Sequence, residues 1–422
     1  MDISALIIVL LTLAAGESAP REPVSHAWLR AGSVLLGAIL VAGSAELSVW
    51  KLRGRLKCWP HLASHWGWRF RRLQKAHHVL WLLSTFCMLY VAGWPQLVRT
   101  HCATPLTFLD QLLVLTPVLL PLIAGWAAFL RFEHTVDCLL ADCRGEPRPA
   151  PRLRQQLLDQ CKASLGLVLP PVLMTFALHD ALRLTMGQRQ LEAHGWVLHL
   201  VVLVAMVGLM PAWLRVLWSA QPMTAGSLRD RLLQTAAAAR LRLRDILVLS
   251  TEAGQYNAAV SGLLPQLRYV YLTRSLVELL EERELEAVLL HEAAHVRRRH
   301  LPIRMLVLLM PIALALAVQA TCPGALDTTS RWLLAHGVPA TWQGALLLPA
   351  AAATYLLVAM GTISRRLELD ADRWVAQQGA GDALASALTK LAERDPHPDK
   401  ATWLHPSLQS RIEAIVAQAA SL

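Results

Sequence analysis

Long apolar runs alternate with polar connections along most of the chain. Most runs are close to the ~20 residues that a helix needs to cross a bilayer, and they lie at about residues 31–50, 76–98, 107–130, 163–182, 195–217, 301–320 and 340–360. A shorter run at 3–15 follows Asp2 and no basic residue, so it is interpreted as a first span and not as a signal peptide. The pattern predicts a mainly α-helical, polytopic membrane protein with about eight spans.

The composition agrees with a membrane protein, because 55% of the residues are hydrophobic and only 17% are charged. The net charge of +10 would suit nucleic-acid binding, but Lys and Arg gather at the ends of the apolar runs. We therefore expect a lipid bilayer as a partner and no nucleic acid. The seven cysteines form no C-x-x-C pair, so neither a thiolate zinc site nor a disulfide framework is expected. Nothing in the sequence indicates an oligomeric state.

The number of Lys and Arg residues alternates between successive connections. Residues 51–75 contain eight and residues 131–162 contain six. The other connections contain two, one, two and one, in the order 16–30, 99–106, 183–194 and 321–337. By the positive-inside rule the Lys- and Arg-rich connections are cytoplasmic. This predicts both termini in the cytoplasm and an inner or cell membrane of bacterial type.

Four regions are expected: six spans, a polar segment, two further spans and a second polar segment, at 1–218, 219–300, 301–360 and 361–422. In the first polar segment Ser227 is expected to cap a helix. The stretches 245–251 and 266–273 are rich in β-branched, aromatic and aliphatic residues, so they predict strands of a small sheet. The two polar segments together predict a cytoplasmic α+β domain of the zincin type.

An H-E-x-x-H pattern, His291, Glu292 and His295, lies in the stretch 281–300, which lacks Gly and Pro and predicts a helix. A spacing of four places both imidazoles on one helix face, with Glu292 beside them. A catalytic zinc site uses such nitrogen ligands, an open position for water and a carboxylate that deprotonates the water. The pattern therefore indicates one zinc ion per chain, with Glu292 as the base. The alternative is a helix face that carries two histidines by chance.

A third ligand is expected after the last span, which we expect to end near Gly361, with a new helix beginning at Ser364. Two consecutive spans return the chain to the side it left, so Glu368 re-enters the cytoplasm on the side of the two histidines. A carboxylate there completes the His₂Glu set of catalytic zinc peptidases.

Asp372 lies four residues after Glu368, so it shares its helix face and is predicted to orient a ligand histidine. The alternative for both carboxylates is a solvated helix with salt bridges to Arg365 and Arg366.

Four segments together resemble the family of integral membrane zinc metallopeptidases that includes HtpX and the CAAX prenyl endopeptidases. They are Asn257-Ala258 with Gly262, Leu285–His295 around H-E-x-x-H, Ser364-Arg365 through Glu368 to Ala371-Asp372, and His405-Pro406 with Arg411-Ile412. The resemblance covers about residues 225–420.

The resemblance implies that His291, His295 and Glu368 bind zinc, that Glu292 is the base and that Asp372 supports a ligand. It implies that His405 helps at the oxyanion, although a His before Pro could equally be a turn residue. It also implies that an edge strand with Asn257, Ala258 and Gly262 lines the substrate cleft.

These features predict a zinc-dependent endopeptidase that hydrolyses membrane or membrane-proximal polypeptides at the cytoplasmic face. Two alternatives keep this chemistry: a transducer whose first six spans sense a signal and gate the protease, or a CAAX-type prenyl-protein endopeptidase. A transporter or scaffold with a decayed metal site is the alternative of another class. Outside the motifs, His179 and Asp180 are interpreted as an interfacial pair and not as a buried polar relay.

Overall fold

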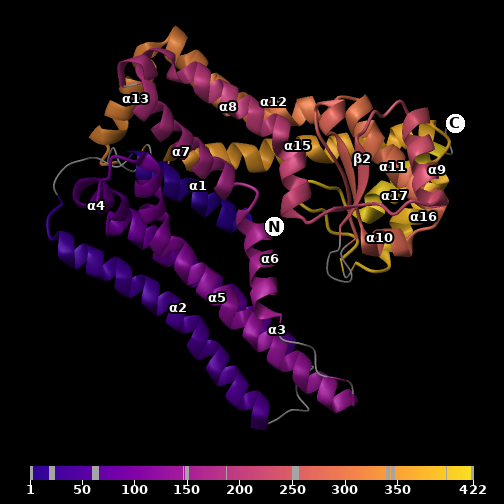
Figure 1. The fold of residues 1–422 in the computed structure, drawn as a ribbon, viewed down its shortest axis with the longest axis horizontal. Coiled ribbons are helices and arrows are strands. Elements are labelled where there is room, and N and C mark those ends of the chain that lie inside the picture. The colour runs from indigo at the N-terminus through magenta and orange to yellow at the C-terminus, as the bar shows by residue number, and fades with distance from the viewer. Residues whose placement is uncertain are drawn as a thin grey trace. The chain divides into compact units, whose positions relative to one another are not determined.

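The chain divides into two compact units, each built from two stretches of sequence (Figure 1). One unit comprises Met1–His199 and Ser330–Pro349, and the other comprises Leu200–Thr329 and Ala350–Leu422. The structure is a computed structural model, and the residues it describes are 3–18, 24–58, 66–145, 147, 152–186, 188–249, 256–338, 343, 347–395 and 397–419. The four predicted regions, with boundaries at 218, 300 and 360, stay a prediction.

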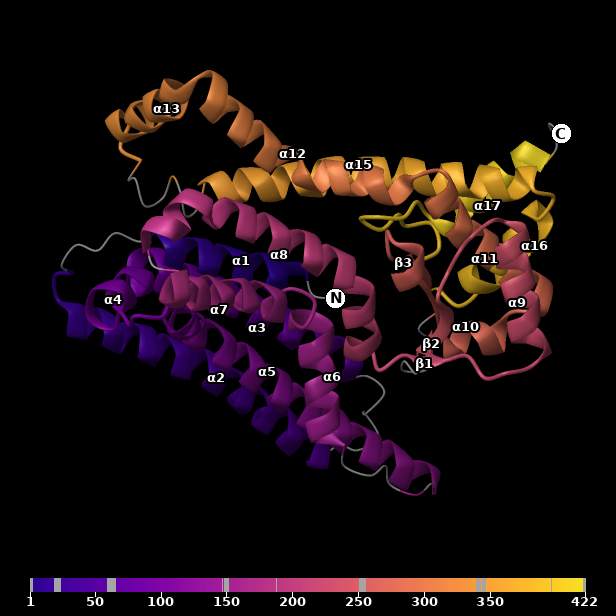
Figure 2. The ribbon, with the colours of Figure 1, turned by 45° about the horizontal axis from the view of Figure 1, so that its top comes forward.

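Long helices make up the first unit. They are α1 (Ile3–Ser18), α2 (Ala27–Cys58), α3 (Trp66–Phe86), the π-helical segment η2 (Cys87–Val91), α4 (Trp94–His101), α5 (Thr107–Arg144), α6 (Leu153–Leu165), α7 (Leu169–Met186) and the first part of α8 (Gln188–Leu217). Figure 2 shows α2 and α5 running side by side. Val49 of α2, Phe70 of α3 and Phe132 of α5 belong to one buried cluster, which holds these three helices together.

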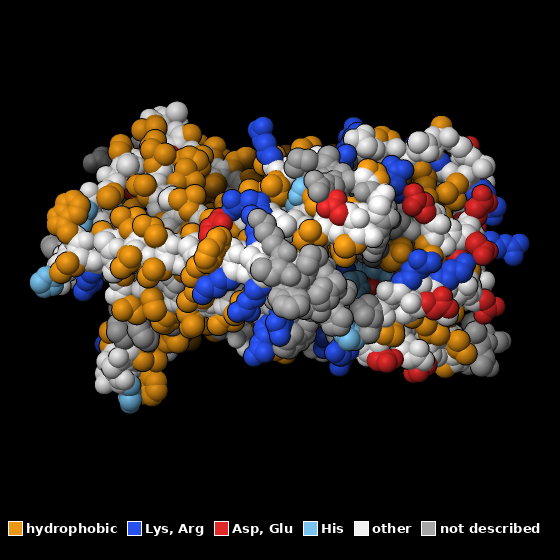
Figure 3. Space-filling model, turned by 90° about the horizontal axis from the view of Figure 1, so that it is seen from below, with side chains coloured by type: hydrophobic (Ala, Val, Ile, Leu, Met, Phe, Trp, Pro, Cys, Tyr) orange, Lys and Arg blue, Asp and Glu red, His pale blue; other side chains and the backbone are white. Residues whose placement is uncertain are grey.

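Within the described residues, two helices are long and apolar enough on their own to cross a bilayer, Ala27–Leu56 and Thr107–Cys143. Two bent helix pairs meet the same condition if each pair counts as one span: Arg69–Val91 with Trp94–His101, and Leu153–Leu165 with Leu169–Met186. On the face that Figure 3 shows, hydrophobic side chains gather over its left part. The fold is therefore mainly helical with several apolar helices, and the count of eight spans stays a prediction.

Asp180 is buried in the first unit, where it caps the N-terminus of α5. Its carboxylate accepts hydrogen bonds from the backbone N–H groups of Thr107 (3.0 Å) and Phe108 (2.8 Å). The first N–H groups of a helix have no partner within the helix, and a carboxylate there also complements the helix dipole. Asp180 is therefore a buried helix cap, and the interpretation of His179 and Asp180 as an interfacial pair stays a prediction.

The second unit contains a four-stranded sheet in the order β1-β2-β4-β3. The strands are β1 (Gln221–Pro222), β2 (Asp245–Leu249), β3 (Ala258–Ser261) and β4 (Tyr269–Thr273). Both predicted strands are present as β2 and β4, which pair in parallel, whereas β3 pairs antiparallel to β4. Among the described residues β3 pairs with β4 alone, so it is an edge strand of this sheet.

Helices cover this sheet and enclose the core of the second unit. Those around the sheet are α9 (Ser227–Ala238), α10 (Arg274–Leu279), α11 (Glu282–Arg297), α16 (Gly381–Ala392) and α17 (Leu408–Ala419). Leu232 of α9, Ile246 of β2, Leu272 of β4 and Leu289 of α11 are buried in one cluster. The expectation that Ser227 caps α9 was wrong, because Gly226 is the N-cap and no side chain caps the helix.

Three helices lie in the region of the last two expected spans: α12 (His300–Thr321), α13 (Pro323–Ala335) and α15 (Leu348–Gln377). The connection expected at 321–337 thus contains a helix. The expected break between Gly361 and Ser364 was also wrong, because α15 continues through both residues. A Cβ at Gly361 would lie 2.9 Å from Cδ1 of Trp403, so this glycine allows the chain around Trp403 to pack on α15.

Candidate metal centre

The helix α11 carries the H-E-x-x-H residues and is anchored at its start. Glu281 and Glu284 form a capping box, in which each side chain accepts a hydrogen bond from the backbone of the other residue. Glu284 is buried and also accepts hydrogen bonds from Ser386 (2.7 Å) and Lys390 (2.8 Å) of α16. His291, Glu292 and His295 are all buried on this helix. The predicted helix and its common histidine face are therefore present.

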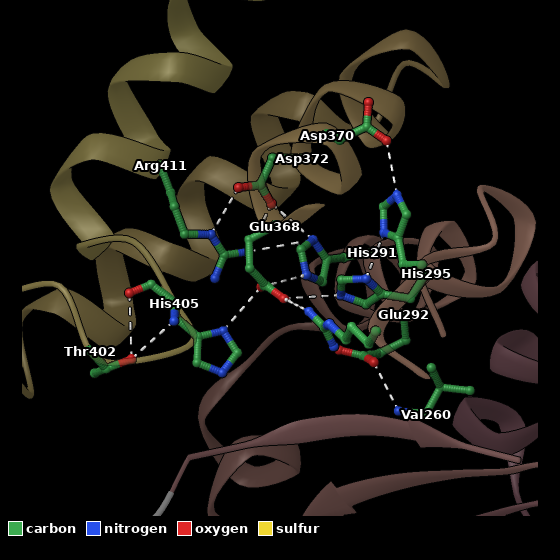
Figure 4. Close-up of polar contacts among 12 residues, drawn as sticks. Val260, His291, Glu292, His295, Glu368, Asp370, Asp372, Thr402, His405 and Arg411 are labelled. Carbon is green, nitrogen blue, oxygen red and sulfur yellow. Dashed lines mark hydrogen bonds and ion pairs between the residues drawn. The ribbon is translucent and has the colours of Figure 1, made fainter. Parts of the chain in front are cut away.

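Glu368 of α15 lies opposite the two histidines (Figure 4). Its carboxylate oxygens lie 3.4 Å from Nε2 of His291 and 3.3 Å from Nε2 of His295. Tetrahedral zinc holds nitrogen and oxygen ligands at about 2.0–2.1 Å, which separates neighbouring ligand atoms by roughly 3.3–3.4 Å. Both the donor types and their spacing therefore fit a zinc ion between His291, His295 and Glu368.

Two further groups hold the carboxylate of Glu368. Arg304 of α12 donates a hydrogen bond to Oε1 (2.8 Å), and Nδ1 of His405 lies 3.1 Å from Oε2. Burial alone would raise the pKa of Glu368, but the hydrogen bonds from His291, His295 and His405 lower it far below its usual value. The carboxylate is thus anionic, as a metal ligand must be. Arg304 forms a salt bridge with Glu368. The alternative of a solvated helix had expected salt bridges to Arg365 and Arg366 instead.

Glu292 faces the edge strand and the histidines at once. Its Oε2 accepts a hydrogen bond from the backbone N–H of Val260 in β3 (2.9 Å). One ligand atom each of His291, Glu292 and His295 lie within 4.8 Å of one another. Neighbouring residues on a helix are about 100° apart around its axis, so Glu292 can reach a water at the centre while its carboxylate stays on the side of β3.

Asp372 orients His291, as its spacing predicted. Its Oδ1 lies 2.8 Å from Nδ1 of His291, so the Nδ1–H donates to the carboxylate and Nε2 is the ring nitrogen on the side of Glu368. Burial alone would lower the pKa of His291, but the charge and hydrogen bond of Asp372 raise it to about 9 in the metal-free chain, so zinc binding would displace a proton from Nε2. Burial would raise the pKa of Asp372, but Arg411 lowers it to about 2.

Arg411 of α17 completes this group with two 2.8 Å hydrogen bonds to the two oxygens of Asp372. A paired, doubly bonded carboxylate is held in one orientation, which in turn fixes the ring of His291. Sequence reasoning quoted Arg411 only as part of a motif and gave it no role. It also missed Arg304, His300 and Asp370, although the last two lie within the same polar stretches as the expected ligands.

His405 lies at the mouth of the site and is 54% exposed. Its backbone N–H donates to Oγ1 of Thr402 (3.1 Å), and the N–H of Thr402 donates to the carbonyl of His405 (2.9 Å), which closes a tight turn. Trp403 inside this turn donates from Nε1 to the carbonyl of Leu357 in α15 (2.8 Å). His405 is therefore both a turn residue and a neighbour of Glu368.

A cleft of about 420 Å³ opens onto these residues, lined among others by Asn257, Ala258, Glu292, Glu368 and His405. Asn257 and Ala258 lie at the start of the edge strand β3. Gly262 ends this strand at φ +120°, and a Cβ there would lie 2.7 Å from the backbone of the Leu267–Arg268 segment. Gly262 therefore shapes the turn after β3.

Two buried histidines and a glutamate on one helix, with a second carboxylate opposite, match a metallopeptidase type of site. A family profile described as "Peptidase family M48" matches residues 222–419, which contain all of these groups. This part of the chain belongs to peptidase family M48, and the resemblance to the HtpX and CAAX prenyl endopeptidase family is confirmed.

Curated relatives carry the name "Protease HtpX homolog". The one from Methylibium petroleiphilum is 28% identical over 233 residues, which are 47% of this chain and 75% of the relative. Those from Burkholderia mallei and Burkholderia thailandensis are 38% identical over 151 residues, which are 33% of this chain and 47% of each relative. The crystal structure of S. mikatae Ste24p aligns with 93% of this chain at 18% identity and a TM-score of 0.49.

Proposed function

We propose that the chain is a zinc-dependent endopeptidase of the membrane. The observation that carries the proposal is the convergence of His291, His295 and Glu368 at zinc-like spacing, with Glu292 between them and an edge strand. Zinc bound there would polarise a peptide carbonyl and lower the pKa of a bound water. Glu292 would take the proton of that water and pass it to the leaving amine.

The edge strand β3 supports an extended polypeptide as the substrate. The carbonyl of Asn257 accepts a hydrogen bond from the N–H of Thr273 in β4, so both backbone groups of Ala258 and the carbonyl of Val260 face the open edge, while the N–H of Val260 donates to Glu292. A substrate strand would pair with these groups, and its peptide bond would lie beside Glu292. The site also sits between helices that continue into apolar segments, α12 after α11 and the first half of α15 before Glu368. These connections favour membrane or membrane-proximal substrates.

Metal removal tests this function. The purified full chain in detergent should cleave an unfolded membrane polypeptide, lose this activity when a chelator removes the metal, and regain it with about one equivalent of zinc per chain. Cleavage can be followed by gel electrophoresis and its position by mass spectrometry. Cleavage that persists after complete metal removal would contradict the proposal, and a chain that binds no zinc would support the transporter or scaffold alternative.

We further propose that the site faces the cytoplasm, because the alternation of Lys and Arg places residues 51–75 and 131–162 on that side. Reporter fusions at Gly324 and Ala401 should then report opposite sides of the membrane, since one predicted span separates them. Ala401 should report the cytoplasm. Both fusions on one side would break this topology, and Ala401 outside would reverse the orientation.

A further inference from the structure

His300 lies directly behind the metal-binding histidine His295. It is the first residue of α12 and is 1% exposed. Arg299 before it has φ +60° and ψ +31°, a left-handed conformation that a residue other than glycine adopts only when its surroundings demand it. This bend between α11 and α12 brings the His300 ring to 5.1 Å from the His295 ring, measured between centroids.

Hydrogen bonds connect His295 through His300 to a carboxylate. Nδ1 of His295 lies 2.9 Å from Nδ1 of His300, and Nε2 of His300 lies 2.9 Å from Oδ2 of Asp370. Asp370 is held in turn by Arg298, which donates to Oδ1 (2.8 Å) and also contacts Oδ2. The chain of contacts therefore runs from Arg298 and Asp370 to His300 and then to His295.

The positions of the protons follow from the two ends of this chain. Asp370 can only accept, so Nε2 of His300 carries a hydrogen, and in the neutral imidazole its Nδ1 then has a lone pair. That lone pair must accept the hydrogen of Nδ1 in His295, which leaves the lone pair of His295 on Nε2, the atom that faces Glu368. His300 is not a fourth ligand, because it contacts the ring nitrogen of His295 that points away from Glu368.

We infer that His300 is a positioning residue for the metal ligand His295, through which Asp370 acts on the metal centre. This inference rests on the proposed zinc site. The two ligands are thus supported differently: His291 donates directly to Asp372, whereas His295 donates to an imidazole that donates to Asp370. Both arrangements fix the ring and its tautomer, and both make the ligand nitrogen a better electron donor.

Three substitutions of His300 separate positioning from packing. The Oδ1 of Asn is as many bonds from Cβ as the Nδ1 of His, so His300→Asn keeps an acceptor for His295. The Nε2 of Gln is as many bonds from Cβ as the Nε2 of His, so His300→Gln keeps only the contact with Asp370. His300→Ala keeps neither. The full chain is purified in detergent, and its zinc affinity is measured by competition with a chromophoric chelator.

We expect His300→Ala and His300→Gln to lower the zinc affinity about 10- to 100-fold, the usual effect of losing a group that supports a metal ligand. His300→Asn should lower the zinc affinity clearly less than His300→Gln does, although Asn is smaller than Gln. Asp370→Ala leaves Nε2 of His300 without its acceptor and changes a residue whose side chain is 30% exposed. It should also lower the affinity, and it serves as the test if the His300 variants fail to fold.

Wild-type affinity in His300→Ala or Asp370→Ala would overturn the inference, and so would an order that follows side-chain volume, with Gln best. In either case the proposed function would stand, provided that the wild-type chain binds zinc and His291→Ala does not. Absence of zinc in the wild-type chain would instead overturn the proposed function and the inference with it.

Discussion

Glu292→Gln should keep its zinc and lose at least about 100-fold of its peptide-cleaving rate, the usual scale for a missing general base. Gln has nearly the shape of Glu, and its side-chain oxygen can still accept the hydrogen bond from the N–H of Val260. It cannot take a proton from the attacking water. The measurement is the initial rate of cleavage of an unfolded membrane polypeptide, with bound zinc determined on the same preparation.

Glu286→Gln is the matched control for this substitution. Glu286 lies on the same helix, but it pairs with Arg231 at the surface, away from the metal centre. We expect it to cleave at close to the wild-type rate, because exposed ion pairs contribute little to stability. A zinc-loaded Glu292→Gln protein that cleaves as fast as this control would refute the role of Glu292 as the base.

The histidine face could be predicted from the sequence because it depends on local geometry alone. A helix without Gly or Pro places residues 291 and 295 on one face whatever surrounds it. The approach of Glu368 was predicted from two consecutive spans that would return the chain to the same side; its carboxylate does lie 3.3–3.4 Å from the two histidines, whereas the spans stay a prediction. Sequence spacing within S-R-x-x-E-x-x-A-D then gave Asp372 its position beside His291, and the structure places it 2.8 Å away.

The groups that sequence reasoning missed depend on tertiary contacts. Arg304 reaches Glu368 from α12, and Arg411 reaches Asp372 across 39 residues of sequence. His300 seemed to be one more basic residue of a polar run, because its position depends on the left-handed bend at Arg299. The pattern of hydrophobic and polar residues does not predict such a bend.

The continuity of α15 was missed for a different reason. The last span was expected to end near Gly361, and glycine weakens a helix by about 1 kcal/mol relative to alanine. In the structure this glycine stays helical, and a Cβ there would collide with Trp403. The ligand Glu368 therefore sits on the same rigid helix as the apolar segment that precedes it.

Glu368→Ala should lose most of its zinc, because it removes the charged member of a three-ligand site and leaves two neutral imidazoles. Arg304→Ala is the matched control, since it removes the ion-pair partner of Glu368 and leaves all three ligands in place. If Glu368 served only to pair with Arg304, the two substitutions would have the same effect on zinc.

The measurement that tests the metal centre most directly is the zinc content of the purified full chain after removal of free metal. We expect about one zinc per wild-type chain, a similar content in Arg304→Ala, and little zinc in His291→Ala, His295→Ala and Glu368→Ala. A wild-type chain without zinc, or a Glu368→Ala chain that retains as much as the wild type, would contradict a zinc site formed by His291, His295 and Glu368.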